Sequence, residues 1–358
     1  MCFFSLQAVD ERDWTNDWPY RVVKGLEFIP SVESVEGYNF SITYALDGGR
    51  FGDQLTNYLR ALWISWKYQL PFHYRPFDYS EELCLSNAHS KLENQIFDAK
   101  LEYFHFLELD KSRTIFSYLD RKQFGDKKLI WNVGMLTPFI EEHFCEKLDD
   151  EAFRSFIEPL VKPKRELNLI AIPENRKSIA VHVRTGVGYD WKVNIENMPT
   201  KFPPETFYIA GLKEAFAFFE GQPLYIYVFT DHPDPASILE DLIKGITFPP
   251  DAIAECRLKN RHDQNVLEDL FSMTRFDAII HPDSSISRLV VTLSAPLFEV
   301  KPSHWSEVRI NSEGKSVYDS NGRIIVDPLI IHRSARGKPI INQVVHPIEG
   351  KVESNSVL

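Results

Sequence analysis

Strand-like and helix-like segments alternate regularly between residues 178 and 300, and no other pattern in the chain limits its fold so strongly. Short apolar runs indicate strands at 178–184, 224–229, 278–281 and 297–300. Apolar residues at helical spacing indicate helices at 204–219, 235–244, 265–274 and 284–293. This alternation predicts an α/β fold with a parallel sheet between two layers of helices. Such sheets bind ligands beyond the carboxyl ends of their strands.

The first part of the chain carries a shorter version of the same pattern. Residues 38–46 alternate like a strand, 47–52 form a glycine-rich turn, and a helix is predicted from Leu55 onward. A further strand and a long helix are predicted at 129–133 and 137–157. The opening unit is therefore expected to be a strand, a glycine-rich loop and a helix.

Residues 160–177 combine prolines with several charges, a composition typical of a connection between domains. The length of 358 residues also favours two domains. After residue 305 the pattern changes, and Asn321-Gly322 between β-prone runs predicts a hairpin. The last residues, 353–358, are expected to be frayed. We therefore predict three segments, at 1–165, 166–305 and 306–358.

Composition excludes several classes of function. The net charge of -11 argues against a broad nucleic-acid surface and against membrane attachment through basic residues. No run approaches the ~20 apolar residues that a membrane span needs, and peripheral membrane contact is left open. The cysteines show no metal-ligand spacing, and their isolated contexts predict buried free thiols and a cytoplasmic location. They are Cys2, Cys84, Cys145 and Cys256.

The strand that ends at 182–184 carries the first candidate site. Residues two apart share a face of a strand, so His182 and Arg184 point together, away from Val181 and Val183. A guanidinium suits a diphosphate because its planar fork donates paired, charge-assisted hydrogen bonds. Gly186 lets a phosphate approach the backbone. The structural alternative is an ordinary strand end with a surface arginine.

Three other strand ends combine polar residues with a following helix. Ser284 and Ser285 precede a predicted helix, which makes them either an anion-binding site or a plain N-cap. The segment 48–54 is a glycine-rich turn with neither Walker nor dinucleotide-binding spacing. Asp231 ends an apolar strand and either contacts a ligand or caps the next helix. No cluster has metal-ligand spacing, so no essential metal is predicted.

Together and in this order, these segments resemble the GDP-fucose-dependent fucosyltransferases related to the α1,2- and α1,6-fucosyltransferases. That family carries Gly-x-Gln before a helix and strands ending in His-x-Arg and Thr/Ser-Asp. It ends with an Asp-Leu helix, a strand and paired serines at a helix start. The matching segments are Gly52-Asp53-Gln54, His182-Val183-Arg184, Thr230-Asp231, Asp269-Leu270, Phe276 to His281 and Ser284-Ser285. The resemblance spans residues 44–300.

The resemblance implies two Rossmann-like domains facing each other across a cleft, the arrangement called GT-B. The hairpin predicted at Asn321-Gly322 would add a small C-terminal β-hairpin extension. The first domain would bind the acceptor and the second the nucleotide sugar. Arg184 would hold the donor diphosphate, while His182 and Asp269 would contact the nucleoside. The other residues implied to bind the donor are Gly49, Gly52, Gln54, Asp231, Ser284 and Ser285.

The predicted reaction transfers fucose from GDP-fucose to a glycan or another hydroxyl acceptor, with inversion and without a metal. Arg184 and the amides near Ser284 would stabilise the charge that builds on the departing diphosphate. An acid would accept the acceptor's proton, Asp190 being the first candidate and Glu196 the second. Asp190 fits equally well as the cap of a turn. Relatives usually carry an acid soon after the motif arginine, where this chain has 185–187, Thr-Gly-Val.

Two alternatives stay open from the sequence. The same fold could transfer another nucleotide sugar. A relative without activity could instead bind a nucleotide sugar or a glycan as a recognition module, and the missing acid after Arg184 favours that reading. The predicted partners are a nucleotide-sugar donor and a glycan acceptor, with no nucleic acid and no transmembrane segment.

Overall fold

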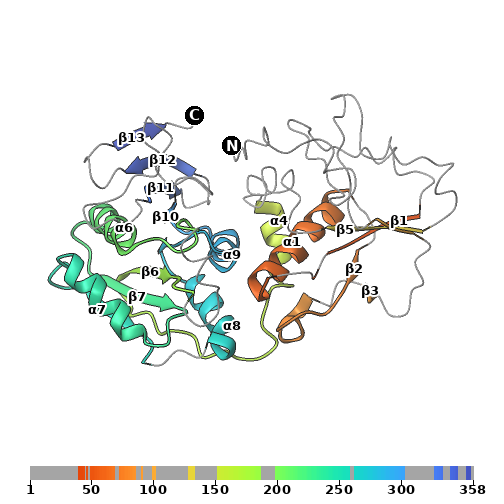
Figure 1. Ribbon diagram of the computed structural model, residues 1–358, viewed down its shortest axis with the longest axis horizontal. Coiled ribbons are helices and arrows are strands. Elements are labelled where there is room, and N and C mark those ends of the chain that lie inside the picture. Colours follow the sequence, from red (N-terminus) through yellow and green to blue (C-terminus); the bar gives the residue numbers. More distant parts are fainter. Residues whose placement is uncertain are drawn as a thin grey trace. The chain divides into compact units, whose positions relative to one another are not determined.

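A computed structural model describes the chain in segments (Figure 1). The described residues are 39–44, 46, 49–68, 72–85, 90–91, 99–101, 128–133, 151–186, 198–258, 262–302, 326–333, 339–345 and 352–355. Contacts divide the chain into two compact units, with the division between Glu166 and Leu167. The predicted assignment of an acceptor domain and a donor domain stays a prediction.

Unit 1 holds a small parallel sheet in the order β1-β5-β4. Its strands are β1 (Asn39–Tyr44), β4 (Ala99–Leu101) and β5 (Lys128–Val133), and a separate pair is β2 (His73–Tyr74) with β3 (Ser90–Lys91). The described helices are α1 (Phe51–Tyr68), the 3₁₀ turn η4 (Ser80–Glu82) and α4 (Glu151–Ile157). The strands predicted at 38–46 and 129–133 are present. Of the helix predicted at 137–157, only α4 lies within the described residues.

An aromatic cluster packs α1 onto β1. Leu55, Tyr58 and Leu59 of α1 are fully buried and share one face of the helix. The Tyr58 ring meets that of Tyr44 edge to face, with ring centroids 5.4 Å apart. The helix begins at Phe51, so the predicted loop is shorter than expected and its last residues form the first helical turn.

Unit 2 is built on an eight-stranded, mainly parallel sheet in the order β13-β12-β11-β10-β9-β6-β7-β8. The five parallel strands are β6 (Lys177–Val183), β7 (Leu224–Thr230), β8 (Ile253–Cys256), β9 (Ala278–Ile280) and β10 (Phe298–Pro302). Four of these are the strands predicted from the alternation, and the α/β class with a parallel sheet is confirmed. β8 escaped prediction because it is a short edge strand that is only half-buried.

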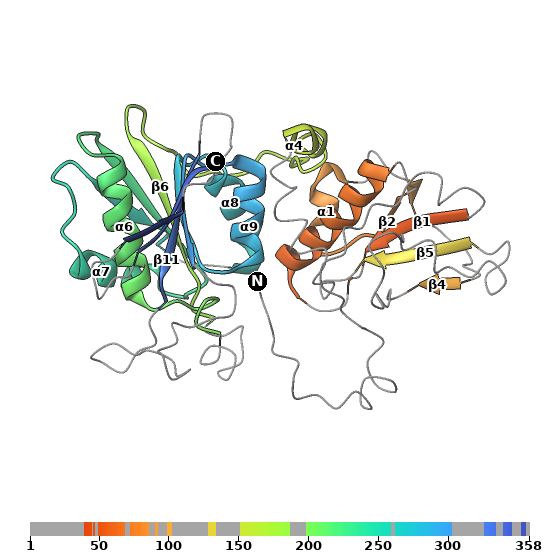
Figure 2. The same ribbon diagram turned by 90° about the horizontal axis from the view of Figure 1, so that it is seen from above.

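Helices cover both faces of this sheet (Figure 2). α6 and α7 lie on one face and α8 and α9 on the other. Their bounds are α6 (Glu205–Phe218), α7 (Pro235–Gly245), α8 (His262–Met273) and α9 (Ser285–Ser294). All seven residues of β7 are buried, as the continuous apolar run at 224–229 predicts for a strand covered on both faces. The main apolar core lies between the sheet and α6 and α7.

Three antiparallel strands extend the sheet beyond β10 and belong to the same compact unit. They are β11 (Pro328–Arg333), β12 (Pro339–Val345) and β13 (Val352–Asn355). The expectation of frayed residues is wrong for 353–355, which pair with β12 as part of β13, and residues 356–358 lie outside the described residues. The hairpin predicted at Asn321-Gly322 lies outside the described residues.

The order of the parallel strands reverses beside β6. From β6 the chain moves outward to β7 and β8, then returns to β9 on the opposite side of β6 and continues to β10. In open sheets of this kind, ligands bind beyond the carboxyl ends of the strands at the point of reversal. A ligand-binding site is therefore expected at the carboxyl ends of β6 and β9.

Two remaining expectations concern thiols and membranes. Cys84 and Cys256 are free, but they are half-buried rather than buried, while Cys2 and Cys145 lie outside the described residues. Within the described parts of the chain, no helix has the length and apolar character needed to cross a bilayer.

Candidate functional site

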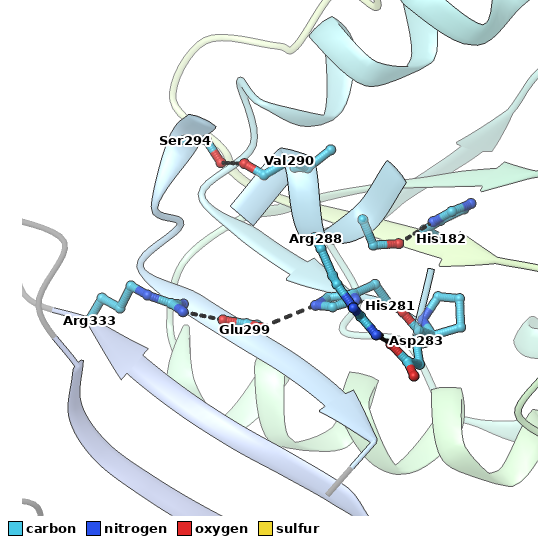
Figure 3. Close-up of polar contacts among 10 residues, drawn as sticks. His182, His281, Asp283, Arg288, Val290, Ser294, Glu299 and Arg333 are labelled. Atoms are coloured by element: carbon cyan, nitrogen blue, oxygen red, sulfur yellow. Dashed lines mark hydrogen bonds and ion pairs between the residues drawn. The ribbon is translucent and has the colours of Figure 1, made fainter. Parts of the chain in front are cut away.

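The end of β6 meets the start of α9 at the point where the strand order reverses. Val181 and Val183 belong to the apolar core, whereas His182 is half-buried on the opposite side of the strand. Its ring nitrogen Nδ1 lies 2.5 Å from the hydroxyl oxygen of Ser287 in α9 (Figure 3). The structure thus brings together the predicted His-x-Arg strand end and the predicted serine-led helix.

Arg184 is the second residue of this strand end and follows β6 directly. Its guanidinium carbon lies 5.2 Å from the centroid of the Phe202 ring, within the range of a cation–π contact. The side chain is half-buried and its Nε atom is buried. The alternative of an ordinary surface arginine therefore does not describe this residue. Sequence reasoning missed Phe202, because no local pattern links it to β6.

Asp231, at the end of β7, fixes the loop that follows Arg184. Its carboxylate accepts hydrogen bonds from the Thr185 amide at 2.7 Å and the Thr185 hydroxyl at 2.9 Å. It also accepts one from the Gly186 amide at 3.1 Å. Gly186 has a φ of 69°, in the region that favours glycine. Asp231 therefore shapes the loop, and a direct contact between Asp231 and a ligand stays a prediction.

Tyr208 of α6 lies beside the same loop. It is fully buried, and burial raises its pKa well above the ordinary value, so its side chain is a neutral phenol. Arg184 and Asp231 both contribute to its electrostatic surroundings. A helical pattern marks Tyr208 only as a core residue, so sequence reasoning did not connect it with the site.

The predicted serine pair lies at the start of α9. Ser284 occupies the N-cap position with extended backbone, and Ser285 is the first helical residue. The Ser284 side chain is buried, yet within the described residues it makes no capping hydrogen bond to the helix. A plain N-cap owes its preference to that bond, so this reading loses its main support. The positive end of the helix dipole lies here and favours an anion.

The loop before α9 is held by side chains on both sides. The Asp283 amide donates to the Thr200 carbonyl at 2.9 Å. The Asp283 carboxylate accepts hydrogen bonds from Arg288 of α9, from Nε at 2.9 Å and also from Nη2 (Figure 3). Arg288 therefore ties the loop to the helix.

A small recess, the cavity discussed below, opens at the carboxyl end of β7. Its lining residues are Tyr227, Val228, Phe229, Thr230, Pro235, Arg257 and Asp269. Thr230 is paired with Val183 of β6, so the cavity lies at the same edge of the sheet as Arg184. Aromatic walls with a few convergent polar groups are typical of small-molecule sites.

Asp269 of α8 supplies the carboxylate of this cavity. Arg257 donates to its Oδ1 atom from Nε at 2.9 Å and from Nη2 at 2.7 Å. Burial raises the pKa of Asp269 to about 6, and the attraction of Arg257 opposes this rise. The ion pair fixes the orientation of the carboxylate, and Oδ2 accepts none of these hydrogen bonds.

The predicted residues of unit 1 lie together at the start of α1. Gly49 has a φ of 75°, and a Cβ atom there would approach the Asp53 side chain to 2.4 Å, so the position requires glycine. Gly52 and Gln54 belong to the first turn of the helix. The Gln54 Oε1 atom is buried and accepts no hydrogen bond from the described residues. That this loop faces the residues of unit 2 across a cleft stays a prediction.

The predicted general bases, Asp190 and Glu196, lie outside the described residues. Among the residues that the structure describes, no group of three His, Cys, Asp or Glu side chains could hold a metal ion. The independence of the reaction from metals stays a prediction.

No protein-family model and no curated protein matches this sequence. Among solved structures, fucosyltransferase NodZ from Bradyrhizobium matches with 12% identity, 83% of this chain and 99% of that chain covered, and a TM-score of 0.38. The chain is similar to solved fucosyltransferases. FUT1 of Arabidopsis thaliana in complex with GDP matches with 9% identity, coverage of 85% and 79%, and a TM-score of 0.42. POFUT1 in complex with GDP-fucose matches with 11% identity, coverage of 72% and 94%, and a TM-score of 0.40. Sequence identities and TM-scores as low as these carry no conclusion about the activity of this chain.

Proposed function

We propose that the chain is a glycosyltransferase that moves fucose from GDP-fucose to a hydroxyl of a glycan or another acceptor, with inversion and without a metal. The observation that carries the proposal is the contact between His182 and Ser287 at the reversal point of the sheet. It joins the strand end that bears Arg184 to the positive end of α9. A guanidinium and a helix N-terminus together suit the two charged phosphates of a nucleotide sugar.

The cavity at the end of β7 supports a guanine base as the nucleoside part of the donor. Guanine presents two adjacent donors, N1–H and the N2 amino group, and a carboxylate accepts from both. Asp269 offers that carboxylate, held in place by Arg257. Uracil presents one N–H between two carbonyl oxygens, and those oxygens would be repelled by the carboxylate. The cavity therefore favours a GDP-sugar over a UDP-sugar, and the family resemblance favours fucose.

The proposed chemistry is a single in-line displacement. The acceptor oxygen forms a bond to the anomeric carbon of fucose while the bond from that carbon to the β-phosphate oxygen breaks. GDP leaves with an added negative charge, which Arg184 and the first-turn amides of α9 would stabilise. The proton of the acceptor hydroxyl passes to a base, for which Asp190 and then Glu196 are proposed.

The wider setting of this reaction is also a proposal. Units 1 and 2 would form the two facing domains of a GT-B enzyme, with unit 1 binding the acceptor through loops that include Gly49, Gly52 and Gln54. Free thiols at Cys84 and Cys256 are in keeping with a reducing, cytoplasmic setting.

Replacement of Arg184 by alanine tests the proposal. We expect transfer from GDP-fucose to fall at least about a hundredfold, because charge on the leaving diphosphate would lose its main partner. Mass spectrometry of the products, with GDP-fucose, GDP-mannose and UDP-sugars offered in parallel, measures both the rate and the choice of donor.

Arg176→Ala provides a matched control at the other end of the same strand. Its guanidinium donates to the carbonyls of Leu224, at 3.1 Å, and Asp251, away from the site. We expect that variant to transfer fucose within about twofold of the wild type while it stays folded. Full transfer by Arg184→Ala would contradict the proposal, and binding of GDP without transfer by the wild type would favour a recognition module instead.

A further inference from the structure

Three charged side chains form a buried line across neighbouring strands of unit 2 (Figure 3). His281 follows β9, Glu299 lies in β10 and Arg333 ends β11, and their exposed fractions are 2%, 2% and 7%. Arg333 donates from Nη2 to Glu299 Oε2, and His281 Nε2 lies 3.2 Å from Glu299 Oε1. Phe298 and Val300 face the apolar core under α6, so Glu299 between them points to the face covered by α8 and α9.

Glu299 is ionised within this line. Burial opposes its ionisation, but the charges of Arg333 and Lys301 and the contact with His281 outweigh burial, and together they hold the pKa of Glu299 well below its usual range. Buried charges are costly, and well-packed apolar residues would stabilise a sheet at least as well. A line of three charged groups in this position therefore calls for a reason other than stability.

The hydrogen bonds of His281 define its state. Nε2 faces a carboxylate oxygen, and Nδ1 lies 2.8 Å from the carbonyl oxygen of Pro282. Neither partner can donate a hydrogen bond, so each contact depends on a donating ring nitrogen. The line thus ends in a ring held between two acceptors, on the residue that precedes the loop of α9.

The Pro282 carbonyl links the His281 ring to the start of the helix. It accepts one hydrogen bond from His281 Nδ1 and another from the Ser284 amide, each 2.8 Å long. The two bonds fix the turn that places Ser284 before α9. Arg288 and Thr200 hold the intervening Asp283 from its other side. The direction in which the first turn of α9 points therefore depends on His281.

We propose that His281 is a positioning residue for the phosphate-binding turn at Ser284 and Ser285, with Glu299 and Arg333 holding its ring in place. The inference rests on the proposed function, because it assumes that a nucleoside diphosphate binds at this turn. It gives His281 a specific role and adds Glu299 and Arg333, which lie in none of the motifs on which the family resemblance depends.

Two substitutions separate the two hydrogen bonds of His281. His281→Asn can keep a donor near the position of Nδ1, toward Pro282, but cannot reach Glu299. His281→Gln can keep a donor near the position of Nε2, toward Glu299, but leaves the Pro282 carbonyl without it. The probes are guanosine, which tests the nucleoside cavity alone, and GDP, which adds the diphosphate. Calorimetry gives the dissociation constant of each probe for each variant, and thermal denaturation reports folding.

We expect His281→Gln to reduce the preference for GDP over guanosine about tenfold. The variant loses the hydrogen bond to the Pro282 carbonyl that helps to fix the turn, and one hydrogen bond contributes roughly this much. Its affinity for guanosine should stay within about twofold of the wild type, because the cavity near Asp269 lies two strands away from β9. His281→Asn should largely retain the preference. If His281 only supported the fold, His281→Gln would lose affinity for guanosine and for GDP by the same factor.

Asp277→Asn is the matched control, at the amino end of β9. Its carboxylate accepts from the Ser178 amide and hydroxyl, each at 3.0 Å, and loss of these bonds should lower stability without changing the preference for GDP. An unchanged preference in folded His281→Gln, or an equal loss in His281→Asn, would overturn the inference. If His281→Gln does not fold, the result with His281→Asn decides. A wild type that binds neither guanosine nor GDP would refute the proposed function instead.

Discussion

At the scale of single residues, Asp231 organises the loop beside Arg184 more than any other side chain described there. One carboxylate accepts the amides of both Thr185 and Gly186 and the Thr185 hydroxyl. The loop that follows Arg184 is therefore held from the neighbouring strand β7.

Asp231→Asn should destabilise the chain and slow transfer. The amide nitrogen of asparagine would face a backbone N–H that then has no acceptor, at a cost of about 1–3 kcal/mol in the free energy of unfolding. Urea denaturation measures this change. Asp241→Asn is the matched control, because Asp241 pairs with Lys244 on the surface of α7 and its loss should cost at most about 0.5 kcal/mol. Equal stability of the two variants would contradict the role of Asp231.

Asp269 predicts a pH dependence of nucleoside binding. Its pKa is raised by burial to about 6, so below that value the carboxyl is protonated and stops accepting from guanine. We expect guanosine affinity to fall about tenfold between pH 7.5 and pH 5, and Asp269→Asn to remove this dependence. Guanosine is the proper probe because the phosphates of GDP titrate in the same range. A flat profile in the wild type would contradict the assignment.

The same group affects stability with the opposite sign from a salt-bridged surface acid. Its pKa in the folded state, about 6, exceeds the ordinary aspartate pKa of 3.8, so the folded state holds its proton more tightly. The free energy of unfolding due to this group is therefore highest below pH 3.8 and declines as the pH rises to about 6.

At the scale of elements, α6 approaches the sheet so closely that one position excludes a side chain. A Cβ atom on Gly211 would lie 2.9 Å from Ile280 Cγ2 of β9 and 3.1 Å from Val300 Cγ1 of β10. Gly211→Ala should gain roughly 1 kcal/mol of helix propensity but lose about 1–3 kcal/mol to overpacking. We expect a net loss of stability in urea denaturation, and a net gain would show that the helix can move away from the sheet.

Element prediction from the sequence succeeded where one strand or helix carries its own signal. The residues of β7 form a continuous apolar run, as expected for a buried strand. The apolar residues of α9 recur at helical spacing. β8 lacks such a signal, because this edge strand is only half-buried and its side chains follow no regular alternation. α1 begins earlier than expected, because glycine at position 52 gave the first turn the composition of a loop.

The candidate site was predictable only in part, for a related reason. Its strand ends and its serine helix follow from local patterns and from the family resemblance. The contacts of Arg184 with Phe202, and of Glu299 with Arg333, join residues far apart in the sequence. Such pairs are created by sheet order and by packing, which a single sequence leaves undetermined.

At the scale of the whole molecule, an acidic chain is proposed to bind an acidic ligand. The net charge of -11 repels a nucleotide diphosphate at long range, but that field is screened within about 8 Å at physiological ionic strength. Attraction must then come from groups in direct contact with the ligand. Arg184 and the first turn of α9 supply positive charge at one edge of the sheet.

β11 runs antiparallel to β10, and this has a consequence for where the chain can be shortened. A protein cut after residue 305 would keep every motif on which the family resemblance rests. It would also lose Arg333 and leave Glu299 as an ionised group sealed inside the sheet without its guanidinium. The final strands therefore help to support the proposed phosphate-binding turn, and we expect their removal to impair it.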